Sequence, residues 1–135
     1  MHMDKTYIGY FDGASELGVK AGYGYILYDN RMVEVSRGYG KVDNPTNNTA
    51  EYTALINLLK ATINIGARRI EVRGDSQLVI KQMLGEWRPK TPHIAKLWLQ
   101  AKTIEGMLWE VTYVWVPREL NREADRLSKM GMLRG

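Results

Sequence analysis

The sequence contains no cysteine and only two histidines among its 135 residues. Without cysteine the chain has no disulfide scaffold, thiol nucleophile, iron–sulfur cluster or cysteine zinc site. His2 and His93 are too few for a histidine metal centre. No apolar run approaches the roughly 20 residues that cross a bilayer, and the first residues lack the layout of a signal peptide. We therefore expect no membrane segment and a cytoplasmic protein.

The composition is that of an ordinary globular domain. Hydrophobic residues make up 44% of the chain and charged residues 25%, and this length supports one hydrophobic core rather than two. We find no linker or internal repeat, and we expect a single domain over residues 1–135. The net charge of +4 is a weak indication of a polyanionic partner.

Hydrophobic periodicity and turn signals predict five strands and four helices. The strands are expected over 5–11, 22–28, 32–38, 69–73 and 109–115, with Asp12-Gly13 ending the first. The helices are expected from Asn48 or Thr49 to near Gly66, from Gly74-Asp75-Ser76 to the break at 87–92, over 94–106, and from about Asn121 to Met130. This order predicts an α/β fold with a mixed sheet and an antiparallel hairpin at its edge.

Four acidic residues occupy positions that the predicted topology draws together. Asp12 and Asp75 each follow a strand, and the two strands are joined through a helix, so a parallel pairing places both acids at one edge of the sheet. Glu51 and Asp125 lie beside the apolar stripes of two helices. The spacing alone is equally compatible with four unrelated surface acids that cap strand ends and helix starts.

A divalent cation would make such a cluster tolerable. Like charges about 5 Å apart repel by roughly 3 kcal/mol at an effective dielectric constant of about 20. An all-oxygen ligand set without histidine or cysteine suits a hard ion, Mg²⁺ or Mn²⁺, and two such ions assist phosphoryl transfer by holding the attacking and leaving oxygens.

Four ordered segments, YFDGAS, NNTAEY, GDSQLVIKQM and WVPRELNREADRLS, resemble the type 1 ribonuclease H family from residue 7 to about 130. The resemblance implies a ribonuclease H-like fold with a five-stranded sheet in the order 3-2-1-4-5. It also implies that Asp12, Glu51, Asp75 and Asp125 are the catalytic, metal-binding carboxylates, with Asp12 bridging two Mg²⁺ ions that Mn²⁺ can replace. The implied reaction is endonucleolytic hydrolysis of the RNA strand of RNA/DNA hybrids, leaving 5′-phosphate and 3′-hydroxyl ends.

The sequence departs from the family pattern in two places. The loop before Asp125 lacks the histidine found in many relatives, and Arg118 is the residue expected to reach the phosphate or leaving group, unless it merely covers the last helix. Glu119 is a weaker candidate for proton transfer. The segment around Trp87 is too short for the lysine-rich protrusion that grips the hybrid in other members, and Trp87 either stacks on substrate or packs at a helix junction. His93 is expected to be exposed.

The substrate-binding residues carried over from the family are Asn47, Asn48 and Gln77, with Ser15 a weaker candidate. Compact neutral donors and acceptors suit the shallow minor groove in which a 2′-hydroxyl distinguishes RNA from DNA. These residues are also ordinary loop and helix-cap residues. Double-stranded RNA stays open as a second substrate.

Three other functions compete with a monomeric hybrid-cleaving enzyme. The first is a catalytically inactive module of the same fold that binds hybrids or structured RNA, against which the four intact acids argue. The second is a DNA-directed nuclease of the same superfamily, which the NNTAE and DSQ segments disfavour. The third is a fragment of a reverse transcriptase.

Overall fold

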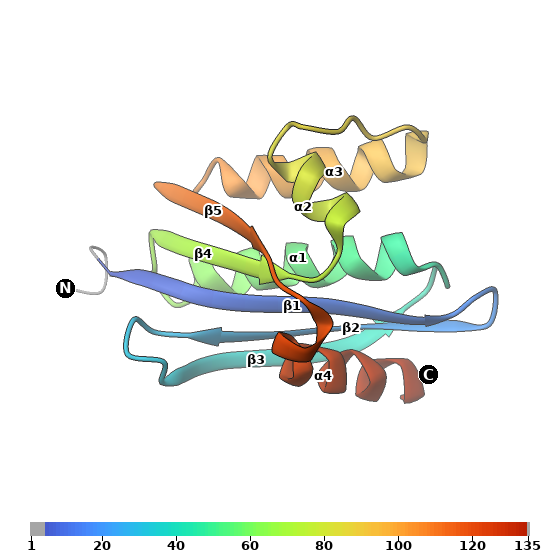
Figure 1. The fold of residues 1–135 in the computed structure, drawn as a ribbon, viewed down its shortest axis with the longest axis horizontal. Coiled ribbons are helices and arrows are strands. Elements are labelled where there is room, and N and C mark those ends of the chain that lie inside the picture. The colour runs from blue at the N-terminus through green and yellow to red at the C-terminus, as the bar shows by residue number, and fades with distance from the viewer. Residues whose placement is uncertain (1–4, 135) are drawn as a thin grey trace.

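The computed structural model describes residues 5–134, so residues 1–4 and 135 of the expected domain, His2 among them, lie outside the described part. Five strands form one sheet in the order β3-β2-β1-β4-β5, which confirms the predicted topology (Figure 1). The strands are β1 (Thr6–Glu16), β2 (Lys20–Tyr28), β3 (Glu34–Val42), β4 (Arg69–Gly74) and β5 (Glu110–Trp115). The helices are α1 (Asn47–Asn64), α2 (Gln77–Met83), α3 (Pro92–Glu105) and α4 (Arg122–Leu133), with a 3₁₀ turn, η2 (Arg118–Leu120), before α4.

Strand β1 is the centre of the sheet and changes partners along its length. It pairs in parallel with β4 from Thr6↔Arg69 to Phe11↔Gly74, and antiparallel with β2 from Ile8↔Tyr28 to Glu16↔Lys20. Beyond Phe11 and Gly74 the two parallel strands separate. We call this place the sheet fork, and the first residues past it are Asp12 on β1 and Asp75 after β4.

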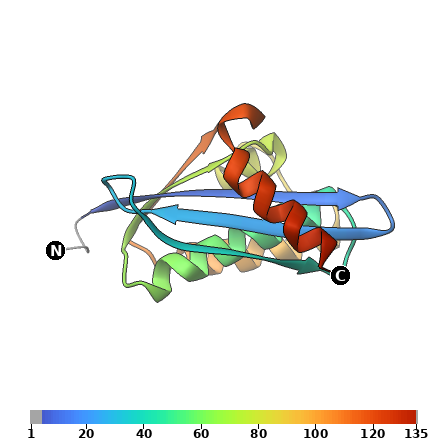
Figure 2. The same ribbon diagram turned by 90° about the horizontal axis from the view of Figure 1, so that it is seen from below.

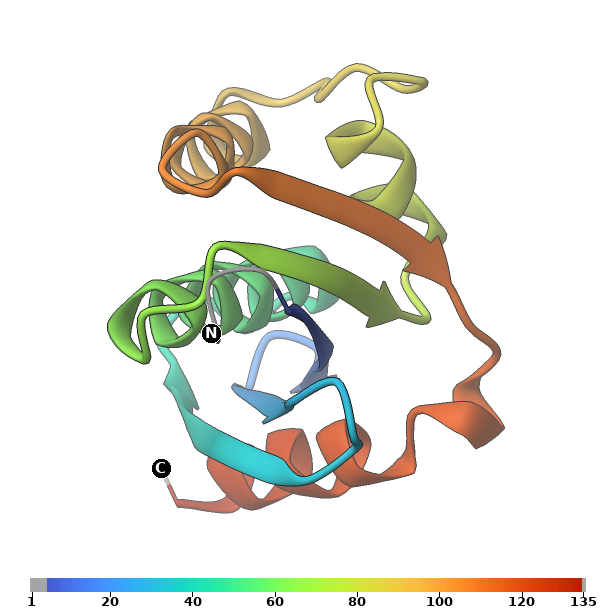
Figure 3. The ribbon, with the colours of Figure 1, turned by 90° about the vertical axis from the view of Figure 1, so that its left-hand side faces the viewer.

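Helices cover the two faces of the sheet unequally. Helix α1 packs on β1 and β2 and also against α3, whereas α4 lies across β1, β2 and β3 on the opposite face (Figures 2 and 3). The core between α1 and the sheet is apolar and includes Phe11, Leu55, Leu58 and Val72, all fully buried. Among residues 5–134 no helix is long and apolar enough to span a membrane.

Two predicted strand boundaries are wrong. Strand β1 does not end at Asp12-Gly13 but continues to Glu16, because β2 keeps pairing with it and the chain turns only at Gly18, whose φ is +76°. Strand β3 covers 34–42 rather than 32–38. Met32 lies in the preceding turn with φ 62°, and the glycine-rich segment after residue 38 pairs with β2 up to Val42↔Ala21.

The helix starts are also shifted by a few residues. Thr46, not Asn48 or Thr49, occupies the N-cap position of α1, and Thr49 is buried inside the helix. Helix α3 begins at Pro92, where a proline needs no hydrogen-bond acceptor, and the Thr91 side chain caps it. Ser76, the last residue of the predicted helix start Gly74-Asp75-Ser76, caps α2 by accepting a hydrogen bond from the amide of Val79.

Glycines let α4 approach the sheet with almost no side chains between. A Cβ atom on Gly22 would lie 2.1 Å from the Met132 nitrogen, and one on Gly24 would lie 2.5 Å from the Ser128 nitrogen. On the helix side Gly131 approaches the Gly40 backbone equally closely. The depth at which α4 sits on the sheet, and with it Asp125 in its first turn, is therefore fixed by contact between main chains.

We expect Gly22→Ala to lower the free energy of unfolding by about 3 kcal/mol, because the added methyl group must displace the α4 backbone. The matched control is Gly106→Ala, where the Thr103 carbonyl oxygen would lie 3.4 Å from the new Cβ. Here a gain of about 0.5 kcal/mol is expected from the stiffer unfolded chain. Urea unfolding of both variants measures the difference. Equal effects would show that α4 can move away from β2 at little cost.

Candidate active site

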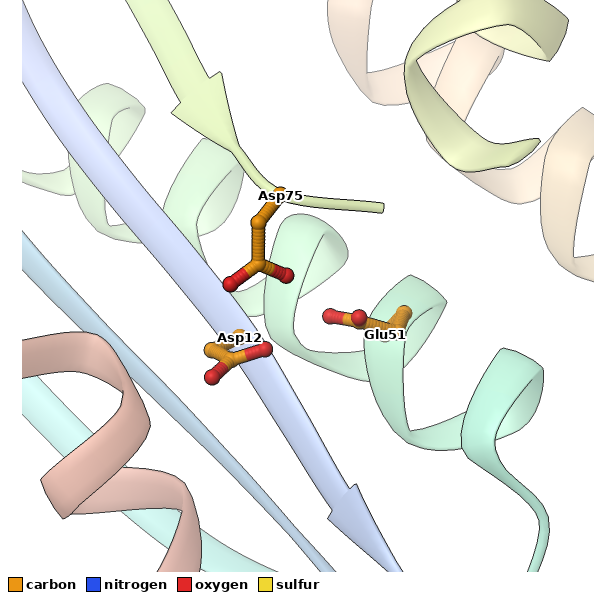
Figure 4. A group of neighbouring side chains, drawn as sticks. All are labelled: Asp12, Glu51 and Asp75. Atoms are coloured by element: carbon orange, nitrogen blue, oxygen red, sulfur yellow. The ribbon is translucent and has the colours of Figure 1, made fainter. Parts of the chain in front are cut away.

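Three carboxylates meet at the sheet fork. Asp12 projects from β1, Asp75 follows the end of β4, and Glu51 comes from the second turn of α1 (Figure 4). Among the residues that the structure describes, these form the group that could hold a metal ion, since each offers an oxygen within 4.8 Å of the others. Asp12 and Glu51 are buried and Asp75 is half-buried.

The sheet fork leaves backbone groups without strand partners, and side chains take their place. The Gly13 amide donates to Oε1 of Glu51 over 2.8 Å. Nδ2 of Asn121 donates to the Phe11 carbonyl over 2.9 Å. Nε1 of Trp115 donates to the Asp75 carbonyl over 3.1 Å. Buried backbone groups need partners, so the acids and their supports are held by the same bonds that close the end of the paired sheet.

Gly13 has a steric role as well. A Cβ atom at this position would lie 2.5 Å from the Ala50 carbonyl carbon and from the Glu51 nitrogen. Only a residue without a side chain lets α1 come this close to β1, and the approach brings Glu51 within reach of Asp12. The Asp-Gly pair that indicated a turn in the sequence instead marks this contact between helix and strand.

Burial and mutual repulsion raise the pKa values of all three acids. Burial is the main cause for Asp12, followed by the charge of Asp75 and contact with Asp125, and together they raise its pKa from 3.8 to about 8. The pKa of Glu51 is also raised, first by burial and then by the charges of Asp12 and Asp75. Burial raises the pKa of Asp75 too, while a hydrogen bond from Asn121 and the charge of Arg118 oppose the shift. A cluster that resists ionisation in this way is suited to a site where cations supply the missing positive charge.

The fourth predicted acid, Asp125, lies at the side of this group. It is close enough to Asp12 to raise that residue's pKa, and its Oδ2 is 3.0 Å from Nζ of Lys129, one turn further along α4. The structure therefore brings three of the four predicted ligands within reach of one ion and pairs the fourth with a lysine. That Asp125 binds metal stays a prediction.

A cavity of about 360 Å³ opens over the acids. Eight of the nine predicted site residues line it: Asp12, Ser15, Asn47, Asn48, Glu51, Asp75, Arg118 and Asp125. The Ser15 hydroxyl donates to Oδ1 of Asn47, which links the end of β1 to the start of α1. The ninth, Gln77, is exposed and lines a separate groove between α2 and β5 together with Trp115.

Of the three remaining candidate residues, one lies at the acids and two do not. Arg118 is exposed in η2 and its charge acts on Asp75, whereas Glu119 faces another cavity, beside Tyr10 and Tyr28. His93 is exposed as expected, and its Nε2 lies 2.9 Å from the Thr49 hydroxyl. The structure thus places Arg118, and not Glu119, at the acids.

Sequence reasoning missed two residues of this site. Lys129 stands four residues after Asp125, a spacing that pairs opposite charges on a helix and that was readable from the sequence. Asn121 occupies the start of α4, where an asparagine indicates a helix cap. Its inward contacts with Phe11 and Asp75 depend on the tertiary fold.

The likeness to known proteins agrees with this geometry. A family model described as reverse transcriptase-like matches residues 10–131. The structure of RNase H1 from the archaeon Halobacterium salinarum superposes with a TM-score of 0.91 and 35% identity, covering 96% of this chain and 99% of that one. The chain belongs to the ribonuclease H family. Its predicted ribonuclease H-like fold is thereby confirmed.

Two further solved structures are similar to this chain. The N-terminal RNase H domain of Rv2228c from Mycobacterium tuberculosis has a TM-score of 0.92 and 34% identity over 97% of this chain and 96% of that one. LC11-RNase H1, isolated from compost and solved in complex with an RNA/DNA hybrid, has a TM-score of 0.89 and 28% identity, covering 95% of this chain and 97% of that one. The match spans only 31% of the full mycobacterial protein and 60% of the curated halobacterial ribonuclease HI.

We expect Asp12→Asn to stabilise the metal-free protein by about 1–3 kcal/mol near pH 8, because it removes charge repulsion at nearly constant shape. The folded pKa of about 8 exceeds the ordinary 3.8, so the folded state holds the proton more tightly. The wild-type free energy of unfolding should therefore fall as the pH rises from about 4 to about 8 in chelator. The variant should lose the part of this fall that Asp12 causes, while Glu51 and Asp75, whose pKa values are also raised, keep theirs.

Asp29→Asn is the matched control for this measurement. Oδ1 of Asp29 accepts hydrogen bonds from the amides of Arg31 and Val33, and these bonds lower the pKa of the carboxyl. Neutralising a structural aspartate of this kind should bring no gain in stability. Thermal unfolding in chelator compares the two variants, and an Asp12→Asn protein less stable than wild type would contradict the assignment of Asp12 to a repelling cluster.

Proposed function

We propose that this domain is a metal-dependent endoribonuclease that hydrolyses the RNA strand of RNA/DNA hybrids and leaves 5′-phosphate and 3′-hydroxyl ends. The observation that carries the proposal is the group Asp12, Glu51 and Asp75, whose oxygens lie within 4.8 Å of one another at the base of a cavity. Membership of the ribonuclease H family and likeness to a hybrid-bound relative support the same reaction.

We propose that the carboxylates hold two Mg²⁺ ions, which Mn²⁺ can replace. All of the candidate ligands are carboxylate oxygens, which hard divalent cations prefer. Burial, and then the charges of neighbouring acids, raise the pKa values of Asp12 and Glu51, and a bound cation would oppose both effects. When bound, the ions supply charge for the oxygens of the scissile phosphate and acidify the attacking water.

The protein's own groups hold the substrate in place for this chemistry. Asp12 lies near both Asp75 and Asp125, since both raise its pKa, and it shares the metal-binding group with Glu51 and Asp75. It is therefore the residue best placed to serve two ions. Arg118 is exposed at the cavity wall and would neutralise the phosphate or the leaving oxygen. The exposed Asn47 and Asn48 would meet the minor groove with neutral polar atoms.

A second groove adjoins the cavity over the acids and could hold part of a nucleic acid duplex. Asn48 lines both the acidic cavity and a groove of about 500 Å³ that also contains Trp87, Arg88 and Lys90. Trp87 is 46% exposed, and Nζ of Lys81 lies 5.3 Å from its ring centroid. An exposed aromatic ring among cations is the usual platform for a nucleic acid strand, so we propose that this groove receives the second strand of the hybrid and offsets the missing protrusion.

Four finer points stay predictions beside this proposal: double-stranded RNA as an open second substrate, Mg²⁺ as an ion that Mn²⁺ can replace, a monomeric state and a cytoplasmic location. Exposed Asn47 and Asn48 are compatible with any duplex that presents 2′-hydroxyls in a minor groove. Ion preference and substrate preference can be measured in one set of assays.

Purified protein is expected to cleave end-labelled RNA in an RNA/DNA hybrid when Mg²⁺ or Mn²⁺ is present, and to leave the DNA strand intact. Gel assays with hybrid, RNA/RNA and DNA/DNA duplexes, each with and without metal, provide the test, and Asp12→Asn serves as the inactive control. If the protein binds the hybrid but cleaves it in neither metal, the proposed enzymatic function is wrong and the domain is a binding module. Cleavage of DNA/DNA alone would indicate a DNA-directed nuclease.

Asn48→Ala and Arg118→Ala should separate substrate binding from chemistry. Asn48 lines both the cavity over the acids and the groove that contains Trp87, but it is not a member of the acid group, so its loss should mainly raise KM. Arg118 acts at Asp75, so its loss should lower kcat by about tenfold or more with little change in KM. Steady-state kinetics with the same hybrid substrate measures kcat and KM for both variants. A kcat loss for Asn48→Ala as large as that for Arg118→Ala would overturn this division of roles.

A further inference from the structure

Asn121 joins three of the four segments that carry the acids. Its Nδ2 donates to the Phe11 carbonyl over 2.9 Å, directly before Asp12, and lies 3.4 Å from Oδ2 of Asp75. Its own carbonyl accepts the amide of Asp125 over 3.1 Å, in the first turn of α4. One side chain and its backbone thus contact β1, the end of β4 and α4 at the sheet fork.

The placement of this asparagine does not follow ordinary helix-start chemistry. Asn121 is the N-cap residue of α4, yet within the described chain its side chain makes no capping hydrogen bond. It is turned inward and is only 1% exposed. Its Oδ1 is buried and receives no hydrogen bond from the described residues. A residue serving only the helix would point its Oδ1 at the helix amides.

We infer that Asn121 is a positioning residue of the metal site, which holds the Asp75 carboxylate and the α4 segment bearing Asp125 in register with Asp12. This inference rests on the proposed metal-dependent function. The Nδ2 group is the part that matters, because its two hydrogens reach the Phe11 carbonyl and the Asp75 carboxylate together. Hydrogen bonds that orient ligating carboxylates commonly control metal affinity.

The test uses Asn121→Leu, which keeps the approximate volume and the burial but removes the donor. Asn121→Ala is the second variant in case leucine prevents folding. The control is Thr62→Val, because the Thr62 hydroxyl is also fully buried, donates to the Leu58 carbonyl, and lies about 16 Å along α1 from Glu51 at 1.5 Å per residue. Circular dichroism and melting in chelator establish that each variant folds.

Mn²⁺ binding is then measured without substrate, from the loss of the free-ion electron paramagnetic resonance signal. We expect the Asn121 variants to raise the Kd for Mn²⁺ by about tenfold or more, and to raise the Mg²⁺ concentration that half-activates cleavage in parallel. Thr62→Val should lower the melting temperature but leave both metal values within about twofold of wild type, as a change in stability alone does not alter the fork.

Each outcome decides a separate point. If the Asn121 variants lose stability like Thr62→Val but bind Mn²⁺ as tightly as wild type does, the role of Asn121 is structural and the inference is wrong. If wild type binds Mn²⁺ no better than Asp12→Asn does, the metal site fails and both proposals fall together. If the Asn121 variants bind Mn²⁺ more weakly than wild type does while Thr62→Val does not, the positioning role is supported.

Discussion

Repulsion between buried carboxylates is the constraint to which the rest of this domain responds. Asp12, Glu51 and Asp75 keep oxygens within 4.8 Å of one another, and burial with like charge raises the pKa of Asp12 to about 8. Acids on flexible segments would move apart or turn to solvent. Here Asp12 lies in β1, Glu51 lies in α1 and Asp75 directly follows β4, and these three elements pack on a shared apolar core.

The anchors that hold the acids in place are made mainly of backbone. Gly13 admits α1 close enough for its amide to reach Glu51, and Gly22 and Gly24 let α4 rest on the sheet. Backbone contacts fix the position of a helix more rigidly than side-chain contacts do, because the backbone has no rotamers to change. The glycines thus position the two helices that bring Glu51 and Asp125 toward Asp12.

The strands, the helices and a mixed sheet could be predicted because strand ends and apolar stripes are local signals. The strand order and the metal-binding role of the four acids came from the resemblance carried by the ordered motifs. The end of β1 was predicted wrongly, since Asp12-Gly13 has turn chemistry while the pairing of β2 with β1 is a long-range interaction. Asn121 was overlooked for the same reason: its helix-start position is local, but its contact with Phe11 joins residues far apart in the chain. The Asp125–Lys129 pair was visible as a spacing, but its position beside the acid group required the three-dimensional arrangement.

The sheet fork also divides the molecule into parts of different stiffness. Up to Phe11 the central strand has neighbours on both sides, whereas from Asp12 to Glu16 it pairs only with β2. The far end of the sheet is therefore a three-strand ribbon of β1, β2 and β3, with α4 across it. Fewer inter-strand hydrogen bonds hold a three-strand ribbon than the five-strand body, so we expect the hairpin around Gly18 to open locally more readily than the wider part of the sheet. The spacing of Asp12 and Asp75 stays fixed by the wider part of the sheet.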